Sequence, residues 1–309
     1  MFGLGDALLL MMLAAPVQVE SGQGGYTLPV RVDEVNVVFS ASDFEGRPID
    51  DLVLSDMRLL DDGKRQTKIV KFEHRTELPL RAGFLVDISG SMGSENPRTQ
   101  MITRLFAEKI LRLKSDRAFV MRFAGMQKMM QDWTGSADEL RAASPLVGTN
   151  WSSLGISTAL YDSVYIAVRD QYAKKPELTT GTANVILLFS DGVDDASHAR
   201  LQDVMDICQQ TYTRVYVFYG QPKSHFGEGQ KNLRELTAGT GGRVFYNDDA
   251  AHALNDLHVM ENDLRNNYLI AYRPSHLKDD GKFHAISLTS PTRGGVITTR
   301  SGYYAPRGR

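Results

Sequence analysis

The sequence predicts an α/β protein in which a Rossmann-like, doubly wound and mostly parallel sheet is joined to a small β-rich domain. The first observation is that apolar runs alternate with helical segments over residues 80–250, as parallel strands and their crossover helices do. The second is that both flanks are rich in predicted strands, with the two-residue alternation of a half-buried strand in the N-terminal one. Because neither flank has enough strands to be stable alone, we expect the two flanks to pack together.

These patterns divide the chain into four segments. They are a leader over residues 1–22, an N-terminal β-rich segment over 26–79, the α/β core over 80–250, and a C-terminal helix with strands over 251–309.

The leader contains the apolar stretch Ala7 to Ala15, which is too short to span a bilayer but suits the central region of a secretory signal. Asp6 and the lack of Lys or Arg before this stretch are atypical of such a signal. A buried N-terminal helix is the alternative. We expect export to the periplasm or the extracellular space, and no transmembrane span.

The N-terminal flank is predicted to be antiparallel. Val35, Val37 and Phe39 alternate with polar neighbours, which indicates a half-buried strand. Asp62-Gly63 separates two further apolar runs. Both central residues of a type I′ turn need positive φ, so this pair predicts a tight turn.

The core is predicted from buried strands and helices in alternation. The strands cover 82–87, 118–123, 185–190, 215–219 and 243–246, and the helices lie near 98–114, 137–146, 156–174, 199–211 and 229–238. A glycine-rich string at 239–242 follows a helix and precedes a strand. Phosphate loops run from strand to helix, so we interpret this string as a helix C-cap.

The C-terminal flank opens with a predicted helix over 250–266. Strands are expected over 268–272, 283–288 and 296–300. Asp280-Gly281, between the first two of these strands, is a second tight-turn signal.

Composition excludes several classes of function. The chain has 35 basic and 37 acidic residues and a net charge of -2, so it offers no basic surface for nucleic acid. Cys208, the one cysteine, lies at helical spacing with apolar residues and is interpreted as a core residue. No intrachain disulfide can form. The seven histidines show no zinc-binding spacing.

Hydroxyl and carboxylate side chains occur where the predicted strands end. Asp87, Ser89 and Ser91 form a D-x-S-x-S string after the first buried strand, and Asp191 follows the strand 185–190. In a sheet of order 3-2-1-4-5-6 these two strands are neighbours where the order reverses, which is where ligands bind in such sheets. Thr158 is expected from a loop that opens the helix 156–174.

These five side chains offer only oxygen ligands. Such a set suits Mg²⁺, or Mn²⁺ or Ca²⁺, with some positions left open to water or to a ligand. With at most two carboxylates in contact, the cation would stay electrophilic and would attract a further acidic ligand.

With these motifs, the core resembles a von Willebrand factor type A (VWFA) domain with its metal-ion-dependent adhesion site. The resemblance covers about residues 80–250 and implies that five residues match the family's metal site: Asp87, Ser89, Ser91, Thr158 and Asp191. It also implies a bound Mg²⁺ or related ion, completed by an Asp or Glu of a protein partner. The family often has glycine before the threonine, whereas this chain has Ser157.

The flanks resemble a bacterial family of exported VWFA-related proteins, over about residues 26–306. The strings that carry this resemblance are Val35-Asn36-Val37-Val38-Phe39, Phe44-Glu45-Gly46-Arg47-Pro48, Leu60-Asp61-Asp62-Gly63-Lys64, Tyr268-Leu269-Ile270-Ala271-Tyr272-Arg273-Pro274, Gly281-Lys282-Phe283-His284 and Thr299-Arg300-Ser301-Gly302-Tyr303-Tyr304.

Three functions compete. The first is a metal-dependent protein-binding module without catalytic activity. The second is a Mg²⁺-dependent hydrolase of the phosphohydrolase type with Asp87 as the nucleophile, although Ser89 stands where such sites have a second carboxylate. The third is a structural domain with a vestigial site. Asp194 and Asp195 either strengthen cation capture or lie on a solvated loop face.

Overall fold

The computed structural model describes residues 34–92, 97–112, 114–143, 157–179, 181–219, 227–246, 250–275 and 280–305 of the 309-residue chain. The chain divides into a unit over Met1–Val32 and a unit over Asp33–Arg309, and the fold below is that of the second unit. The predicted leader, residues 1–22, lies outside the described residues. Among the described helices, none has the length and apolar content needed to cross a bilayer.

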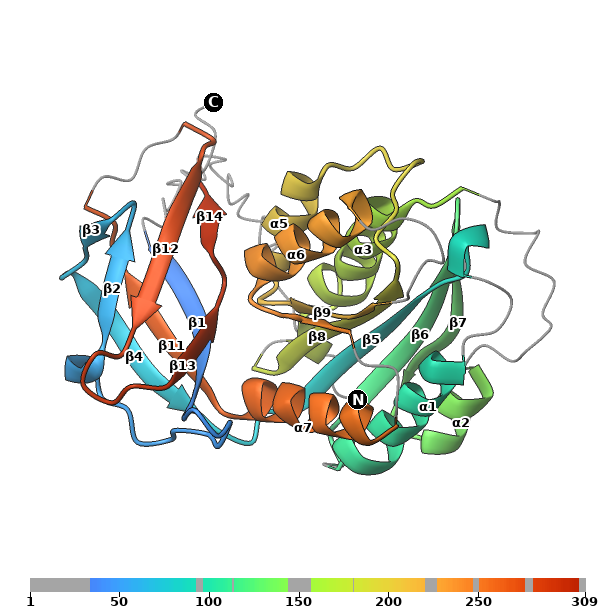
Figure 1. Cartoon of the computed structure of the whole chain (residues 1–309), viewed down its shortest axis with the longest axis horizontal. Coiled ribbons are helices and arrows are strands. Elements are labelled where there is room, and N and C mark those ends of the chain that lie inside the picture. The colour runs from blue at the N-terminus through green and yellow to red at the C-terminus, as the bar shows by residue number, and fades with distance from the viewer. Residues whose placement is uncertain are drawn as a thin grey trace, which may run out of the picture. The chain divides into compact units, whose positions relative to one another are not determined.

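The core contains one mostly parallel sheet with the strand order β10-β9-β8-β5-β6-β7 (Figure 1). Its strands are β5 (Leu80–Asp87), β6 (Arg117–Phe123), β7 (Gln127–Thr134), β8 (Ala183–Ser190), β9 (Arg214–Tyr219) and β10 (Val244–Phe245). Numbered along the chain, this order is the predicted 3-2-1-4-5-6. The edge strand β7, which the sequence did not predict, is antiparallel to β6.

Two layers of helices bury the two faces of this sheet (Figure 1). The helices are α1 (Pro97–Leu105) with the π-helical turn η3 (Phe106–Ile110), α2 (Ala137–Ala143), α3 (Leu160–Val168) with the π-helical turn η5 (Arg169–Ala173), α4 (Pro176–Thr179), α5 (Leu201–Gln210), α6 (Glu228–Thr240) and α7 (Ala250–Arg265). α1, α2 and α7 contribute to the core on one face, and α3, α5 and α6 to the core on the other. The strands are therefore apolar on both sides, as the continuous runs predicted.

Glycines occur where the backbone needs them. A Cβ on Gly83 of β5 would lie 2.3 Å from Cζ of Phe119 on β6, so only glycine fits this packing without a shift. Gly241 has φ of 80° and follows the last residue of α6. The glycine-rich string at 239–242 is thus a left-handed helix C-cap, as predicted.

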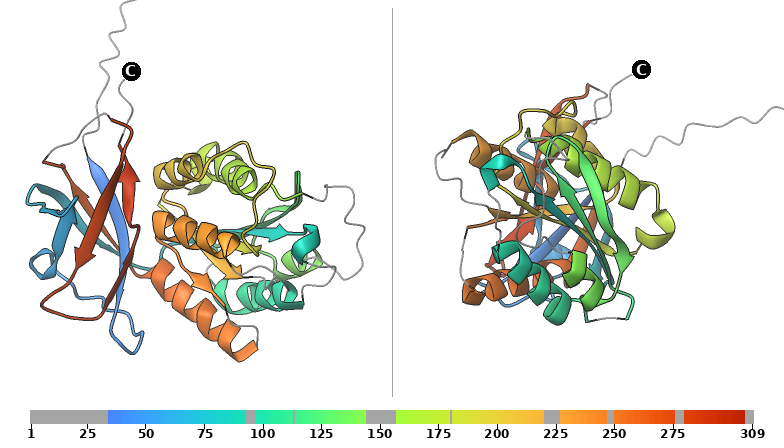
Figure 2. Two further views of the ribbon diagram at one scale, coloured as in Figure 1. Left: turned by 45° about the horizontal axis from the view of Figure 1, so that its top comes forward. Right: turned by 90° about the vertical axis from the view of Figure 1, so that its right-hand side faces the viewer.

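The flanks form two four-stranded sheets, ordered β13-β1-β11-β4 and β14-β12-β2-β3. Their strands are β1 (Val35–Ser42), β2 (Arg58–Asp61), β3 (Lys64–Arg65), β4 (Ile69–Arg75), β11 (Asn267–Tyr272), β12 (Phe283–Thr289), β13 (Val296–Thr299) and β14 (Gly302–Tyr304). Each sheet combines strands from both flanks (Figure 2), and side chains of both sheets share one apolar core. These pairings support our division of the chain into an α/β core and a β-domain built from both flanks, which we propose as its domain organisation.

The two Asp-Gly pairs, both predicted to form tight turns between strands, have different structural roles. Asp62 and Gly63 have φ of 47° and 75° and close the hairpin between β2 and β3, where Asp61 pairs with Lys64. Gly281 also has a positive φ, of 65°. However, β11 and β12 lie in different sheets, so Asp280-Gly281 does not close a hairpin between them.

The C-terminal end of α7 is fixed by a buried ion pair. The guanidinium of Arg265 donates to Oδ2 of Asp116 at 2.8 Å, and both side chains are almost fully buried, at 2% and 1% exposure. Arg265 also donates to the carbonyls of Ile110 and Leu78. Asp116 accepts from the amides of Leu80 and Arg112. This network joins α7 to the start of β5 and to the segment that precedes β6.

Replacing Asp116 by alanine is expected to lower the free energy of unfolding by about 3 kcal/mol, because it removes the buried partner of Arg265 and leaves, among the described residues, only the ion pair with Glu261. Urea denaturation monitored by circular dichroism measures this change. The matched control is Asp138→Ala, which removes an exposed carboxylate paired with Arg141 on α2 and should change stability little. Equal stability of both variants and the wild type would contradict the role given to this network.

Candidate metal centre

Asp87 is the last residue of β5, and its carboxylate is buried with 2% exposure. Oδ1 accepts a hydrogen bond from the amide of Ser89 at 2.9 Å, and Oδ2 accepts one from Oγ of Ser190 at 2.7 Å. Ser190 ends the neighbouring strand β8. The contact between the ends of these two strands follows from their parallel pairing, in which Val86 lies opposite Phe189.

Asp191 directly follows β8 and is also buried, with 1% exposure. Its Oδ1 accepts from the amide of Val193 at 3.0 Å. Its Oδ2 is buried and has no hydrogen-bond partner among the residues that the structure describes. A buried carboxylate oxygen without a partner is costly, and a cation would remove this cost.

The segment after Asp191 is held close to the start of α6. Gly192 has φ of 82°, and a Cβ on it would lie 2.2 Å from the carbonyl oxygen of Gly229. Nδ2 of Asn232 on α6 donates to the carbonyl of Gly192 at 3.2 Å. The Asp191-Gly192 pair is therefore fixed against α6 and is more than a surface turn.

Thr158 lies two residues before α3 and is buried, with 3% exposure. Its amide donates to Oδ1 of Asp195 at 2.6 Å, and its carbonyl accepts from the amides of Asp195 and Ala196. The Thr158 segment is thus bonded to the same loop that begins with Asp191. The backbone around Thr158 therefore lies beside the loop that follows β8, as expected for two segments of one site.

Asp194 is half-buried and Asp195 is exposed, and both carboxylates also accept hydrogen bonds from the backbone near the start of α3. Oδ1 of Asp194 accepts from the amide of Leu160 at 2.8 Å and from Oγ of Ser197 at 2.6 Å. With Asp195 bonded to Thr158, both carboxylates cap the backbone that leads into α3. The sequence signal for this role is weak, because the amides that they bond lie 34 and 37 residues away.

Ser89 and Ser91 follow Asp87 after the end of β5. Ser89 is buried, with 2% exposure, and its carbonyl accepts from the amide of Met92 at 3.1 Å. The backbone of Ser91 belongs to a 3₁₀ turn, η2 (Gly90–Met92), but its side chain lies outside the described residues. The structure therefore brings Asp87, Ser89 and Asp191 to one edge of the sheet, with the Thr158 segment bonded to the Asp191 loop.

Ser190 is a residue of this edge that our site prediction omitted. Its hydroxyl donates to Asp87 and accepts from the amide of Gly192 at 3.0 Å. The signal was present, since Ser190 lies beside Asp191 at the end of a predicted strand.

The pKa of Asp87 is raised to about 6, chiefly by burial and to a lesser extent by the charge of Asp191, while hydrogen bonds from Ser89 and Ser190 oppose these effects. Two buried carboxylates at adjacent strand ends form a site of concentrated negative charge. Oxygen donors alone, one of them without a partner, are what a hard divalent cation binds. The described residues therefore fit a cation of this kind.

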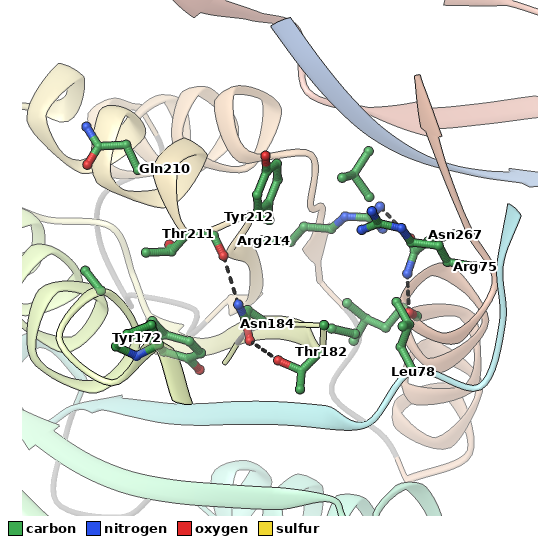
Figure 3. Close-up of a pocket in the computed structure, with 16 residues that line it drawn as sticks. Arg75, Leu78, Tyr172, Thr182, Asn184, Gln210, Thr211, Tyr212, Arg214 and Asn267 are labelled. Carbon is green, nitrogen blue, oxygen red and sulfur yellow. Dashed lines mark hydrogen bonds between the residues drawn. The ribbon is translucent and has the colours of Figure 1, made fainter. Parts of the chain in front are cut away.

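A sizeable cavity lies elsewhere in the described part of the chain (Figure 3). Its volume is about 570 Å³, and its walls include Ala183, Asn184 and Arg214 at the starts of β8 and β9. Asp87 and Asp191 lie at the opposite ends of the parallel strands. Several polar groups of the wall are bonded to one another, since Asn184 pairs with Thr182 and with the carbonyl of Thr211.

The sheet order and the two helical layers define the fold of the core. The core has a VWFA-like fold. No family model matches the chain, and no curated protein matches it.

Solved structures similar to the chain include three bacterial proteins. An aerotolerance-related membrane protein from Bacteroides fragilis is 15% identical, with a TM-score of 0.46 over 59% of this chain and 98% of that one. The hypothetical protein BatB from Bacteroides thetaiotaomicron is 14% identical, with a TM-score of 0.43 over 59% and 96%. A von Willebrand factor type A protein from Catenulispora acidiphila is 15% identical, with a TM-score of 0.41 over 78% and 73%. Likeness at this level says nothing about function.

Replacing Asp195 by alanine is expected to weaken divalent-cation binding by the VWFA-like domain roughly tenfold, because residues that orient metal ligands typically have effects of this size. The carboxylate holds the amide of Thr158 without being one of the five predicted ligands. Calorimetric titration with Mg²⁺ measures the affinity, and Asp138→Ala, on the exposed surface of α2, is the control. An unchanged affinity would show that Thr158 needs no such support.

The raised pKa of Asp87 predicts a stability change with pH in protein freed of metal. Between pH 3.8 and about 6 the folded state binds more protons than the unfolded state. The free energy of unfolding should therefore fall by up to about 3 kcal/mol as pH rises through this window, and stay lower above it. The difference between wild type and Asp87→Asn in urea denaturation at pH 4 and pH 7 isolates this effect. A difference that does not vary with pH would refute it.

Proposed function

We propose that the chain is a divalent-metal-dependent protein-binding module for adhesion or assembly. In this proposal Asp87, Ser89, Ser91, Thr158 and Asp191 hold Mg²⁺, or Mn²⁺ or Ca²⁺ in its place. The observation that carries it is the pair of buried carboxylates at adjacent strand ends, one of which has an oxygen without a hydrogen-bond partner among the described residues.

The residues of the site would play different parts. The oxygens of Asp87 are already oriented by Ser89 and Ser190, and a carboxylate oxygen keeps lone pairs for a cation after one hydrogen bond. Asp191 would offer its unpartnered Oδ2. A bound cation would supply a positive charge that attracts a carboxylate from outside the chain.

The proposed ligand is therefore a protein that presents an Asp or Glu side chain. Because the site has few carboxylates and several hydroxyls, part of the positive charge of the cation stays uncompensated. The cation therefore binds an acidic ligand more strongly than a neutral one. We also propose that the protein acts after export to the periplasm or extracellular space, as the sequence of the leader indicates.

Binding is better supported than hydrolysis. A nucleophilic Asp87 would have to be reached by the phosphorus atom of a substrate, but its side chain is only 2% exposed. The residue two positions further along is Ser89, which cannot act as the carboxylic acid of such a mechanism.

Removing either buried carboxylate is expected to abolish cation binding at this site. Calorimetric titration of Mg²⁺ into the full chain should show one binding event in the wild type and in the Asp138→Ala control. The same event should be lost in Asp87→Ala and in Asp191→Ala. Equal Mg²⁺ affinity in all four proteins would remove the proposed site.

The partner is tested separately, by affinity capture from the extracellular or periplasmic extract of the source cells. Capture in Mg²⁺ buffer should recover a protein that is absent when chelator replaces Mg²⁺ and when Asp87→Ala is the bait. Recovery that does not depend on the cation or on Asp87 would favour a structural domain with a vestigial site.

A further inference from the structure

Three side chains of the β-domain converge near the turn between β2 and β3. One ligand atom from each of Asp61, Asp62 and His284 lies within 4.8 Å of the other two. Ligand atoms around one tetrahedral ion, with bonds of about 2.0–2.2 Å, are about 3.4 Å apart. A single ion can therefore bind all three when each side chain moves toward it by less than about 1 Å.

Asp61 is held in position by two tyrosines of the β-domain. It is the last residue of β2 and has 6% exposure. Oδ2 accepts from the hydroxyls of Tyr272 and Tyr303 at 2.7 and 3.1 Å. Burial raises the pKa of both tyrosines, so they remain neutral donors. Among the described residues no hydrogen bond involves Oδ1 of Asp61, which leaves this oxygen for another ligand.

Asp62 and His284 are held together across the strands. Oδ1 of Asp62 accepts from the amide of Ala285, and Oδ2 lies 2.9 Å from Nδ1 of His284. The imidazole is stacked on the ring of Tyr303, with centroids 5.3 Å apart and an interplanar angle of 17°. The ring and the carboxylate thus have fixed positions before any ion arrives.

The second nitrogen of His284 gives an observation independent of the carboxylates. The side chain is 9% exposed, and its Nε2 is buried without a hydrogen-bond partner among the described residues. Oδ1 of Asp280 lies 3.6 Å from Nε2, which is too long for a hydrogen bond. A histidine that binds a cation through one nitrogen usually directs the other at a carboxylate or carbonyl, and Asp280 is in position to serve.

A small cavity opens on this cluster. Its volume is about 40 Å³, and Asp61, Asp62 and His284 line it together with Lys64, Gln66 and Ser275. A site of about 10–15 Å³ is enough for one water-sized species, so an ion with a bound water fits. Among the residues that line it, the two carboxylates of Asp61 and Asp62 outnumber the ammonium of Lys64.

We propose that Asp61, Asp62 and His284 form a second metal site, which binds a divalent transition-metal cation such as Zn²⁺. One imidazole nitrogen with two carboxylate oxygens suits such an ion, whereas the oxygen donors at the edge of the core sheet suit Mg²⁺. The two sites therefore differ in the cation that they select. The second site joins β2 to β12, and so links the N-terminal flank to the C-terminal flank.

The test is calorimetric titration of Zn²⁺ into the full chain after treatment with chelator. Wild type and Asp87→Ala should bind one Zn²⁺ with equal affinity, because Asp87 belongs to the other site. Asp62→Asn and His284→Gln should each weaken this binding roughly tenfold or more, while Mg²⁺ binding stays as in the wild type. Circular dichroism checks that each variant is folded.

If His284→Gln does not fold, Asp62→Asn alone tests the second metal site. Asparagine keeps an oxygen for the amide of Ala285 and tolerates the positive φ of 47° at this position. Absence of Zn²⁺ binding in the wild type would overturn the second site, and so would unchanged Zn²⁺ affinity in Asp62→Asn. Either result would show a hydrogen-bonded cluster without an ion, and would leave the Mg²⁺ proposal standing.

Discussion

The parallel pairing of β5 with β8 is the constraint on which the candidate site depends. These strands lie side by side where the order of the sheet reverses, so their last residues meet at one edge. The pairing places Ser190 in contact with Asp87 and brings Asp191 close enough for its charge to raise the pKa of Asp87. The apolar strands supply the energy that holds two carboxylates together, because burial on both faces outweighs the cost of desolvating the charges.

Hydrogen bonds between loops complete the edge. Asp162 on α3 accepts from the amides of His198 and Ala199, and Oγ of Ser197 accepts from the amide of Asp162. Together with the contacts of Asp194 and Asp195, these bonds fasten the start of α3 to the loop that follows β8. Two of the three segments that carry the proposed ligands are thereby held to each other.

The parts of the fold that could be predicted are those with a strong local pattern. Buried strands and amphipathic helices carry periodic apolar residues, and their alternation restricts the sheet to few orders. β7 was missed because its edge position leaves most of its side chains half exposed, so that Gln127 and Lys128 give it no apolar run. β3 and β14 are only 2 and 3 residues long, too short for any period to show.

The candidate site was predictable where its residues follow strands, as Asp87 and Asp191 do. The roles of Asp194, Asp195 and Ser190 depend on contacts between segments far apart in the chain, which local spacing does not encode. The cluster of Asp61, Asp62 and His284 depends even more on contacts between distant segments. Asp62 and His284 are separated by 222 residues, and only the pairing of β12 with β2 brings them together.

The β-domain is assembled from both flanks, and the chain leaves it through β4 and returns through β11. These two strands are hydrogen-bonded neighbours, with Arg75 opposite Asn267. The VWFA-like domain is therefore inserted into the β-domain, and the two strands that connect the domains, β4 and β11, are hydrogen-bonded side by side. Cleavage of one loop of the VWFA-like domain would leave both of its connections held by the β-domain. A different domain with similarly spaced ends could replace the VWFA-like domain without disturbing the β-domain.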